Sequence, residues 1–222
     1  MKHRKHLFSD RRDAAKQLVE VLPMDRIRSE QWEFVAVSRG GLELSDMMNE
    51  RYDLSIDFLF SETITAPNNS ECEVARVSEH EEMVLHEKLI EAFDIKLDYI
   101  YGEAHRKYEE KILSMVYRYR HGRQFENVKD KTVLLIDEAA ETGLKLLTAI
   151  KTVMGMHPRA VYVAVPVLPT DVLESLEPLV DDIFYLHDIE DFVDTGSYYG
   201  ILEEVSDQEI ERMLGDKTCK LK

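Results

Sequence analysis

The sequence predicts an α/β fold: a doubly wound parallel sheet covered by helices on both faces, with a small appended cap. Short apolar runs alternate along the chain with segments of helical periodicity, and this alternation indicates right-handed crossovers between parallel strands. At two of the points where an expected strand ends, polar residues occur in unusual density. We see neither an internal repeat nor a low-complexity linker, so we expect a single domain over residues 1–222.

The strands are expected in chain order at short apolar or alternating runs. Before them, Ser9 and the charged residues that follow indicate the start of a first helix. Buried strands are expected at residues 34–37, 133–136, 161–165 and 183–186. Residues 55–60 give another strand and residues 72–77 a weaker one, separated by a predicted loop at residues 66–70.

The remaining apolar periodicity is helical. A long, charged, proline-free helix is expected over about residues 96–119. Its spacing pattern places five residues on one stripe: Tyr101, His105, Tyr108, Ile112 and Met115. Further helices are expected over about residues 143–153 and through Leu173 and Leu176.

Composition and charge exclude several classes of protein. Among 222 residues, 44 are acidic and 28 basic, giving a formal net charge of −16. Such a surface disfavours coating by nucleic acid or anionic lipid. The longest apolar stretch, residues 161–169, is far shorter than the ~18 residues of a membrane-spanning helix. We expect no membrane association.

The N-terminus and the cysteines indicate a reducing compartment. Basic residues at Lys2, Arg4 and Lys5 are followed by charged residues where a secretory signal would be apolar, so we expect no export signal. Cys72 and Cys219 stand alone, and the histidines are scattered without zinc-ligand spacing. The expected location is the cytoplasm.

Basic residues are unevenly distributed along the chain. No Lys or Arg occurs between Arg159 and Arg212, whereas several crowd residues 106–123. A polyanionic ligand should therefore contact the first two thirds of the chain. The last part is suited to an uncharged, hydrogen-bonding group.

The first polar strand exit is Ser38-Arg39-Gly40-Gly41, directly after an expected buried strand. Two glycines allow backbone N–H groups to approach a ligand closely, and a guanidinium can pair with phosphate oxygens. In an open parallel sheet, ligands collect outside the carboxyl ends of the strands. The alternative is an ordinary strand-to-helix turn with an arginine facing solvent.

The second polar exit follows residues 133–136. Asp137 and Glu138 end the strand, and a short loop then leads to a helix that begins near Thr142 and Gly143. Carboxylates here can accept hydrogen bonds from sugar hydroxyls, directly or through hydrated Mg²⁺, while the helix start offers N–H groups to a phosphate. Alternatively, the acids only cap the helix and complement its dipole. The segment lacks both the P-loop and the GxGxxG pattern.

Residues 133–145 resemble the thirteen-residue ribose-5-phosphate motif of type I phosphoribosyltransferases: an apolar strand, paired acids, two small residues, a variable residue and Thr-Gly. Other segments resemble, in the same order, a bacterial subgroup of phosphoribosyltransferase-like proteins. They are residues 8–18, 35–41, 66–77, 117–123 and 192–199.

The resemblance implies a parallel sheet with a small hood, which we assign to the N-terminal and C-terminal segments, and commonly a homodimer. It implies a glycosyltransferase of nucleotide metabolism that binds 5-phosphoribosyl-1-pyrophosphate (PRPP) with Mg²⁺. A nucleobase or similar nitrogen heterocycle would displace pyrophosphate. Carried over by position, Asp137 and Glu138 would hold the ribose hydroxyls and the metal. The 5-phosphate would contact Ala140, Thr142, Gly143, Leu144 and Lys145, the pyrophosphate Ser38, Arg39, Gly40 and Gly41, and the base Phe192, Tyr198 and Tyr199.

Glu141 departs from the small residue that many family members carry beside the phosphate. At ~4 Å and an effective dielectric constant near 20, two like charges repel by roughly 4 kcal/mol before screening. Lys145, at helical spacing, could offset this charge. In the hypoxanthine-guanine branch, however, the matching position is acidic and takes a proton from the purine ring. The resemblance therefore implies a general base at Glu141.

Other departures leave alternative functions open. Leu144 and Lys145 replace a small or polar residue and a threonine, and Ser61 and Glu62 stand where close relatives carry a basic pair. Compensating cations would have to come from Arg39, Lys145 or the group Arg118, Arg120 and Arg123. The main alternative is a non-catalytic PRPP or nucleotide sensor. A third hypothesis, phosphoester hydrolysis at the acidic pair, has less support, because no second acidic cluster at another strand exit suggests a two-metal site. RNA stacking on residues 117–123 conflicts with the net charge.

Overall fold

The computed structural model describes residues 6–215 of the chain. The residues used above for the N-terminus, Lys2, Arg4 and Lys5, and the second cysteine, Cys219, lie outside the described residues. Within the described part, no helix is both long and apolar enough to cross a membrane.

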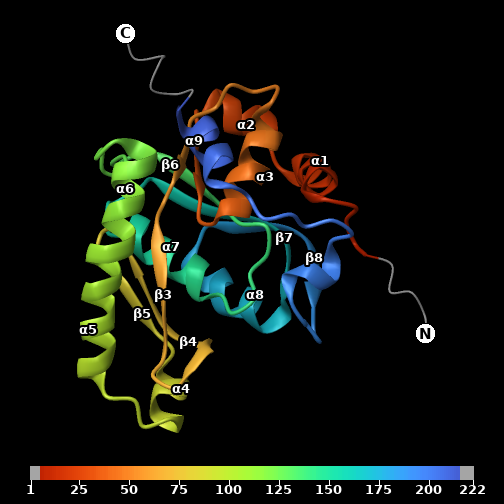
Figure 1. Ribbon diagram of the computed structural model, residues 1–222. Helices are drawn as coiled ribbons and strands as arrows, with labels where there is room; N and C mark the ends of the chain where they lie inside the picture. Colours follow the sequence, from red (N-terminus) through yellow and green to blue (C-terminus); the bar gives the residue numbers. More distant parts are fainter. Residues whose placement is uncertain (1–5, 216–222) are drawn as a thin grey trace.

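A five-stranded parallel sheet forms the centre of the molecule (Figure 1), as predicted. Its strands, in chain order, are β1 (Glu33–Ala36), β2 (Ile56–Phe58), β6 (Thr132–Ile136), β7 (Ala160–Pro169) and β8 (Asp182–Ile189). Across the sheet they lie in the order β2-β1-β6-β7-β8, and all neighbouring pairs are parallel. The order therefore reverses between β1 and β6, which is the point where open α/β sheets bind ligands.

Helices cover both faces because successive side chains of each strand point to opposite sides. On β6, Leu134 and Ile136 belong to one hydrophobic cluster, and Val133 and Leu135 to the other. Helices α1 (Arg11–Val21) and α3 (Arg39–Asn49) pack on the first face. Helices α7 (Leu144–Met154) and α8 (Thr170–Leu176) pack on the second. This arrangement confirms the doubly wound sheet.

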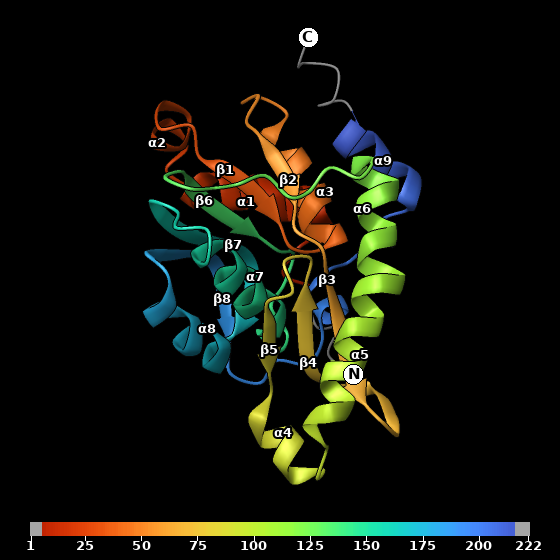
Figure 2. The ribbon, with the colours of Figure 1, turned by 90° about the vertical axis from the view of Figure 1, so that its left-hand side faces the viewer.

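A second, antiparallel sheet projects from the first. It consists of β3 (Ser61–Ala66), β4 (Asn69–Ser78) and β5 (Met83–Leu85). The predicted loop at residues 66–70 is the tight turn that joins β3 to β4. Helix α4 (Glu87–Ala92) follows β5, and the small sheet lies between α7 and the long helix that comes after α4 (Figure 2). It carries one wall of the site described below.

The predicted long helix is present as α5 (Leu97–Lys107), a π-helical turn η1 (Tyr108–Ile112) and α6 (Leu113–Arg120). Its predicted stripe is right for Tyr108, Ile112 and Met115, which contact the core, and wrong for Tyr101 and His105, which are exposed. Before the π turn, the buried positions are instead Ile100 and Ala104, one residue earlier. A π turn inserts an extra residue and so shifts the buried face.

Shorter elements complete the described chain: α2 (Met24–Ser29), the 3₁₀ turns η2 (Glu177–Leu179) and η3 (Thr195–Tyr198), and α9 (Asp207–Gly215). The segment before α1 lies beside the segment that contains η3, since Phe8 forms a parallel β-bridge with Tyr199. These are the two segments from which we predict a hood. Their covering role remains a prediction.

Candidate active site

The ends of β1 and β6 meet closely at the reversal point of the sheet. Ser38 caps α3: its Oγ accepts a hydrogen bond from Gly41 N at 2.9 Å and donates one to Asp137 Oδ1. A Cβ atom built on Gly41 would lie 2.4 Å from the Ile136 carbonyl oxygen, and one on Gly40 would lie 2.1 Å from Glu138 Cδ. Both glycines are thus explained by the close approach of α3 to the end of β6.

Asp137 is fully buried at the end of β6. Its Oδ1 accepts hydrogen bonds from Ser38 Oγ and, at 2.8 Å, from Glu138 N. Its Oδ2 has no hydrogen-bond partner, although Lys145 Nζ lies 3.1 Å away as an ion pair without hydrogen-bond geometry. Because the ion pair with Lys145 is the contact that the described residues make with Oδ2, this oxygen can still accept a hydrogen bond from a ligand.

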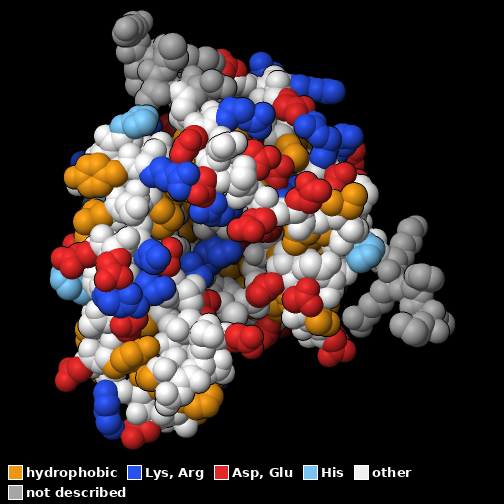
Figure 3. Space-filling view, in the orientation of Figure 1, with side chains coloured by type: hydrophobic (Ala, Val, Ile, Leu, Met, Phe, Trp, Pro, Cys, Tyr) orange, Lys and Arg blue, Asp and Glu red, His pale blue; other side chains and the backbone are white. Residues whose placement is uncertain are grey.

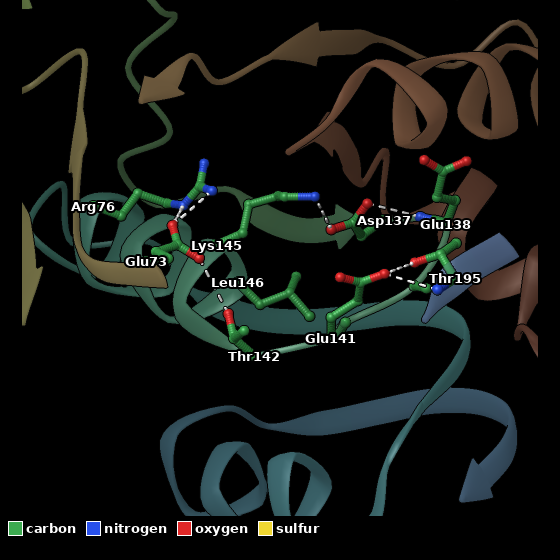
Figure 4. A pocket seen from close by; sticks show the side chains of 12 residues that line it. Glu73, Arg76, Asp137, Glu138, Glu141, Thr142, Lys145, Leu146 and Thr195 are labelled. Carbon is green, nitrogen blue, oxygen red and sulfur yellow. Dashed lines mark hydrogen bonds and ion pairs between the residues drawn. The ribbon is translucent and has the colours of Figure 1, made fainter. Parts of the chain in front are cut away.

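Glu138 turns away from Asp137 and toward Arg11. Arg11 Nε donates to Glu138 Oε2 at 2.5 Å, and its Nη1 donates to Glu43 Oε2 at 2.9 Å and to the Glu203 carbonyl oxygen at 2.7 Å. Figure 4 shows the Glu138 carboxylate pointing away from the other side chains of the pocket. Burial raises the pKa of Glu138, and the Arg11 guanidinium opposes that rise.

The loop after Glu138 leads into α7 through a left-handed residue. Gly143 has φ 72°, and a Cβ there would also lie 3.0 Å from Val172 Cγ1. Glycine adopts this conformation without steric cost. The first amides of α7 lack intrahelical partners, as at any helix start, and Leu144 N donates to Thr142 Oγ1 at 3.4 Å. This segment can therefore donate several hydrogen bonds to an anion.

A cavity of about 250 Å³ lies at this place (Figure 4). It is slightly smaller than the ~300–1,000 Å³ typical of drug-sized ligands, and so fits a group such as a sugar phosphate. Its lining includes seven of the predicted residues: Asp137, Glu138, Ala140, Glu141, Thr142, Gly143 and Lys145. It also includes five that sequence reasoning missed: Glu73, Arg76, Ala139, Leu146 and Thr195.

Glu141 lies on the rim of this cavity and contacts the C-terminal segment. Its Oε1 accepts hydrogen bonds from Thr195 N at 2.7 Å and from Thr195 Oγ1 at 2.6 Å. The loop before α7 is thereby joined to the start of η3.

Comparison with known proteins finds relatives that share one name and a solved structure with a similar fold. No family model matches the chain. Two Mycobacterium tuberculosis relatives, named "Putative phosphoribosyl transferase MT0597" and "Putative phosphoribosyl transferase Rv0571c", are each 22% identical over 209 residues, or 94% of this chain. The chain spans about half the length, 46%, of these curated relatives. The crystal structure of TT1426 from Thermus thermophilus is 29% identical, covers 94% of this chain and 98% of its own, and superimposes with a TM-score of 0.74.

The chain is phosphoribosyltransferase-like by its sequence similarity to these named relatives. The cations predicted to bind PRPP have different surroundings in the structure. Arg39 donates to Asp207 Oδ1 at 2.7 Å and to the Val205 carbonyl oxygen at 3.2 Å, and is not among the cavity-lining residues described. Of the cations expected to compensate for missing basic residues, only Lys145 is among the described residues that line the cavity.

Two members of the basic group near the end of the long helix, Arg118 and Arg120, pair with acids outside the cavity. Arg120 is buried, pairs with Glu79 and lies with its guanidinium 4.5 Å from the Phe60 ring centroid. Arg118 pairs with Asp207 and with Glu211. On the face seen in Figure 3, acidic and basic side chains are interspersed. Among the described residues, the bases that line the cavity are Arg76 and Lys145.

Of the aromatic residues predicted for the base, Tyr199 contacts the backbone of a residue that lines the cavity. Tyr199 is buried, and its hydroxyl donates to the Glu138 carbonyl oxygen at 2.8 Å; burial raises its pKa. The rings of Phe192 and Tyr198 lie 4.8 Å apart. All three belong to the segment that also contributes Thr195 to the cavity lining. Their contact with a base remains a prediction.

Metal binding at the acidic pair also remains a prediction. Among the described residues there is no group of three or more His, Cys, Asp or Glu side chains that could hold a metal ion by itself. Mg²⁺ differs from such protein-bound ions, since it often keeps several waters and binds substrate phosphates with one or two carboxylates. The Oδ2 atom of Asp137, which lacks a hydrogen bond, fits that mode of binding.

Proposed function

We propose that this chain transfers a phosphoribosyl group from PRPP to a nucleobase or similar nitrogen heterocycle, and releases pyrophosphate. The main support is one juxtaposition: the buried Asp137 Oδ2, an acceptor without a hydrogen bond, shares a cavity with the first turn of α7. A carboxylate suits sugar hydroxyls, and helix-start amides suit a phosphate. The two lie together at the reversal point of the sheet.

In the proposed reaction, the bond from the anomeric carbon to the pyrophosphate oxygen breaks and a bond to the ring nitrogen forms. The nitrogen loses its proton to a base, for which Glu141 is our candidate. Positive charge develops on the sugar, and the nearby carboxylate of Asp137 stabilises it. Mg²⁺ bound with PRPP would neutralise the leaving pyrophosphate, and Asp137 with Glu138 are the residues to hold it.

A second candidate is a PRPP or nucleotide sensor that does not turn over. This candidate is favoured because two carboxylates of the site already have partners within the protein. Glu138 pairs with Arg11, and Glu141 accepts hydrogen bonds from Thr195. Each acid would have to release these partners before the bonded oxygen could contact substrate.

Release of pyrophosphate from PRPP, measured with MgCl₂ and a panel of nucleobases, tests the proposal. We expect release that depends on one class of base and is lost in Asp137→Asn. Binding of PRPP without release under every base would favour the sensor. Failure of the chain to bind either PRPP or ribose 5-phosphate would refute both.

A further inference from the structure

Glu73 of β4 accepts hydrogen bonds from several side chains at the edge of the cavity (Figure 4). Arg76 donates to Glu73 Oε1 from Nε at 2.8 Å, and its Nη2 lies 2.7 Å from the same atom. The Thr63 hydroxyl also donates to Oε1, at 3.0 Å, and the Thr142 hydroxyl donates to Oε2 at 3.2 Å. The side chains of Glu73 and Arg76 are only 15% and 11% exposed, so solvent screens their pairing little.

These donors are chemically those of a phosphate site. A guanidinium binds phosphate oxygens through two parallel N–H groups, and a threonine hydroxyl can add a third hydrogen bond. Thr142 also precedes the first turn of α7, from which Lys145 and Leu146 line the same cavity. A carboxylate is the one side-chain group that satisfies such donors with negative charge. Glu73 therefore sits where an incoming phosphate would find its partners.

The charge balance of the cavity points the same way. Four acids and two bases are among its lining residues: Glu73, Asp137, Glu138, Glu141, Arg76 and Lys145. Both bases are paired internally, Arg76 with Glu73 and Lys145 with Asp137. A polyanion that pairs with either cation therefore competes with the carboxylate partner of that cation.

We infer that Arg76 is a phosphate-binding residue of this site and that Glu73 competes with the ligand's phosphate for it. The identification of that ligand as a sugar phosphate rests on the proposed function, whereas the competition does not. Because Glu73 also bonds Thr142, phosphate binding breaks a contact between the small antiparallel sheet and the loop before α7. In the bound state, an ion pair between Arg76 and the phosphate of the ligand replaces the internal pair between Arg76 and Glu73.

Calorimetric titration of the whole chain tests this inference, with inorganic pyrophosphate and ribose 5-phosphate as separate probes. We expect Glu73→Gln to bind pyrophosphate about threefold to tenfold more tightly than the unaltered chain, since a neutral amide competes less for a guanidinium. We expect Arg76→Gln to bind at least about tenfold more weakly. The double variant should lose the gain of Glu73→Gln, because both changes act through the same cation.

Glu62→Gln is the matched control. It makes the same change of charge on the same small sheet, but Glu62 pairs with Lys107 at 3.7 Å and is not among the described cavity residues. Its affinity for pyrophosphate should change less than about twofold. Thermal unfolding identifies any variant that fails to fold, and Arg76→Lys, which keeps the charge but not the paired N–H groups, should then show an intermediate loss.

Two results would overturn the inference: Glu73→Gln binding pyrophosphate no better than Glu62→Gln, or both Arg76 variants binding it as well as the unaltered chain. The proposed function fails separately. If ribose 5-phosphate binds no better than pyrophosphate and is insensitive to Asp137→Asn, the sugar site is wrong, even where the Glu73 and Arg76 effects on pyrophosphate are as expected.

Discussion

Thr195 holds Glu141 with two hydrogen bonds to a single carboxylate oxygen, one from its backbone N–H and one from its hydroxyl. The contact joins residues far apart in sequence, on the loop before α7 and at the start of η3. This contact allows two interpretations of the role of Glu141. Either the carboxylate positions the C-terminal segment over the cavity, or it is held ready to accept a proton from the acceptor base.

Glu141→Gln separates these explanations when paired with Thr195→Val. A general base contributes about 10²–10⁴-fold to a rate. We therefore expect Glu141→Gln to lower turnover at saturating PRPP by about 100-fold or more, with little change in PRPP binding. Glutamine keeps an acceptor oxygen for Thr195 but cannot take the proton. Steady-state pyrophosphate release and PRPP titration measure the two effects.

Thr195→Val removes only the hydroxyl donor and leaves the backbone donor in place. We expect its turnover to fall less than about tenfold, since one hydrogen bond is worth about 1 kcal/mol. Equal losses in the two variants would indicate that the contact, rather than proton transfer, is what matters at Glu141.

Asp137→Asn tests the sugar-binding part of the site. The variant loses a charged acceptor for hydroxyl donors, so we expect ribose 5-phosphate affinity to drop by about tenfold or more. Pyrophosphate has no hydroxyl group on carbon, and its affinity should stay the same or rise, because Lys145 loses its paired charge. Titration of both ligands gives the ratio. Parallel losses for both would assign Asp137 to general folding of the site.

The strands of the parallel sheet could be predicted because their signal is local. Runs such as residues 133–136 are apolar on both faces, and this is required only where helices cover both sides. The face of the long helix could not be predicted at Tyr101, because the π turn at residues 108–112 shifts the register. The π turn contacts the small sheet, and contacts between distant segments are not visible in sequence periodicity.

Some residues of the site could likewise be predicted from the sequence, and others could not. Asp137 and Thr142 lie within one contiguous motif, and so the sequence indicates them together. Arg76 and Arg11 reach the acidic pair or its cavity from other elements, and a single basic residue in a strand or helix has no distinguishing pattern. Conversely, the position of Arg39 after β1 predicts a pyrophosphate contact, whereas its guanidinium pairs with Asp207 of α9. The hydrogen bond from the Tyr119 hydroxyl and then that from Arg39 lower the pKa of Asp207 to about 2.

Arg11→Met should destabilise the chain in a pH-dependent way. Burial raises the pKa of Glu138 above its ordinary 4.5, so the folded state holds this proton more tightly than the unfolded state. The resulting stabilisation is complete below pH 4.5 and is lost as pH rises through the folded-state pKa. Without Arg11 that pKa rises further, and the deficit relative to the unaltered chain should grow from pH 4.5 upward to about 2–4 kcal/mol.

Urea unfolding between about pH 4.5 and 8 measures this deficit. Arg12→Met is the control on the same helix: Arg12 pairs with Glu50, both side chains are about half exposed, and its loss should cost less than about 1 kcal/mol at any pH. A deficit for Arg11→Met that is constant across this range would show that Arg11 acts through packing rather than through the charge of Glu138.

The two glycines after β1 should differ in their tolerance of a methyl group. In Gly41→Ala, the new Cβ meets the Ile136 carbonyl oxygen, which the sheet holds in place, so we expect a loss of more than about 3 kcal/mol. In Gly40→Ala the new Cβ meets the end of the Glu138 side chain, which can move away only by losing its pairing with Arg11. We expect this variant to lose about 1–3 kcal/mol of stability.

Gly102→Ala is the control: Gly102 lies exposed in α5 with nothing within 4 Å of a new Cβ, and the change should stabilise the chain by about 0.5–1 kcal/mol. Urea unfolding of the three variants gives the order. Gly41→Ala as stable as the unaltered chain would contradict the close approach of α3 to β6 that places Ser38 against Asp137.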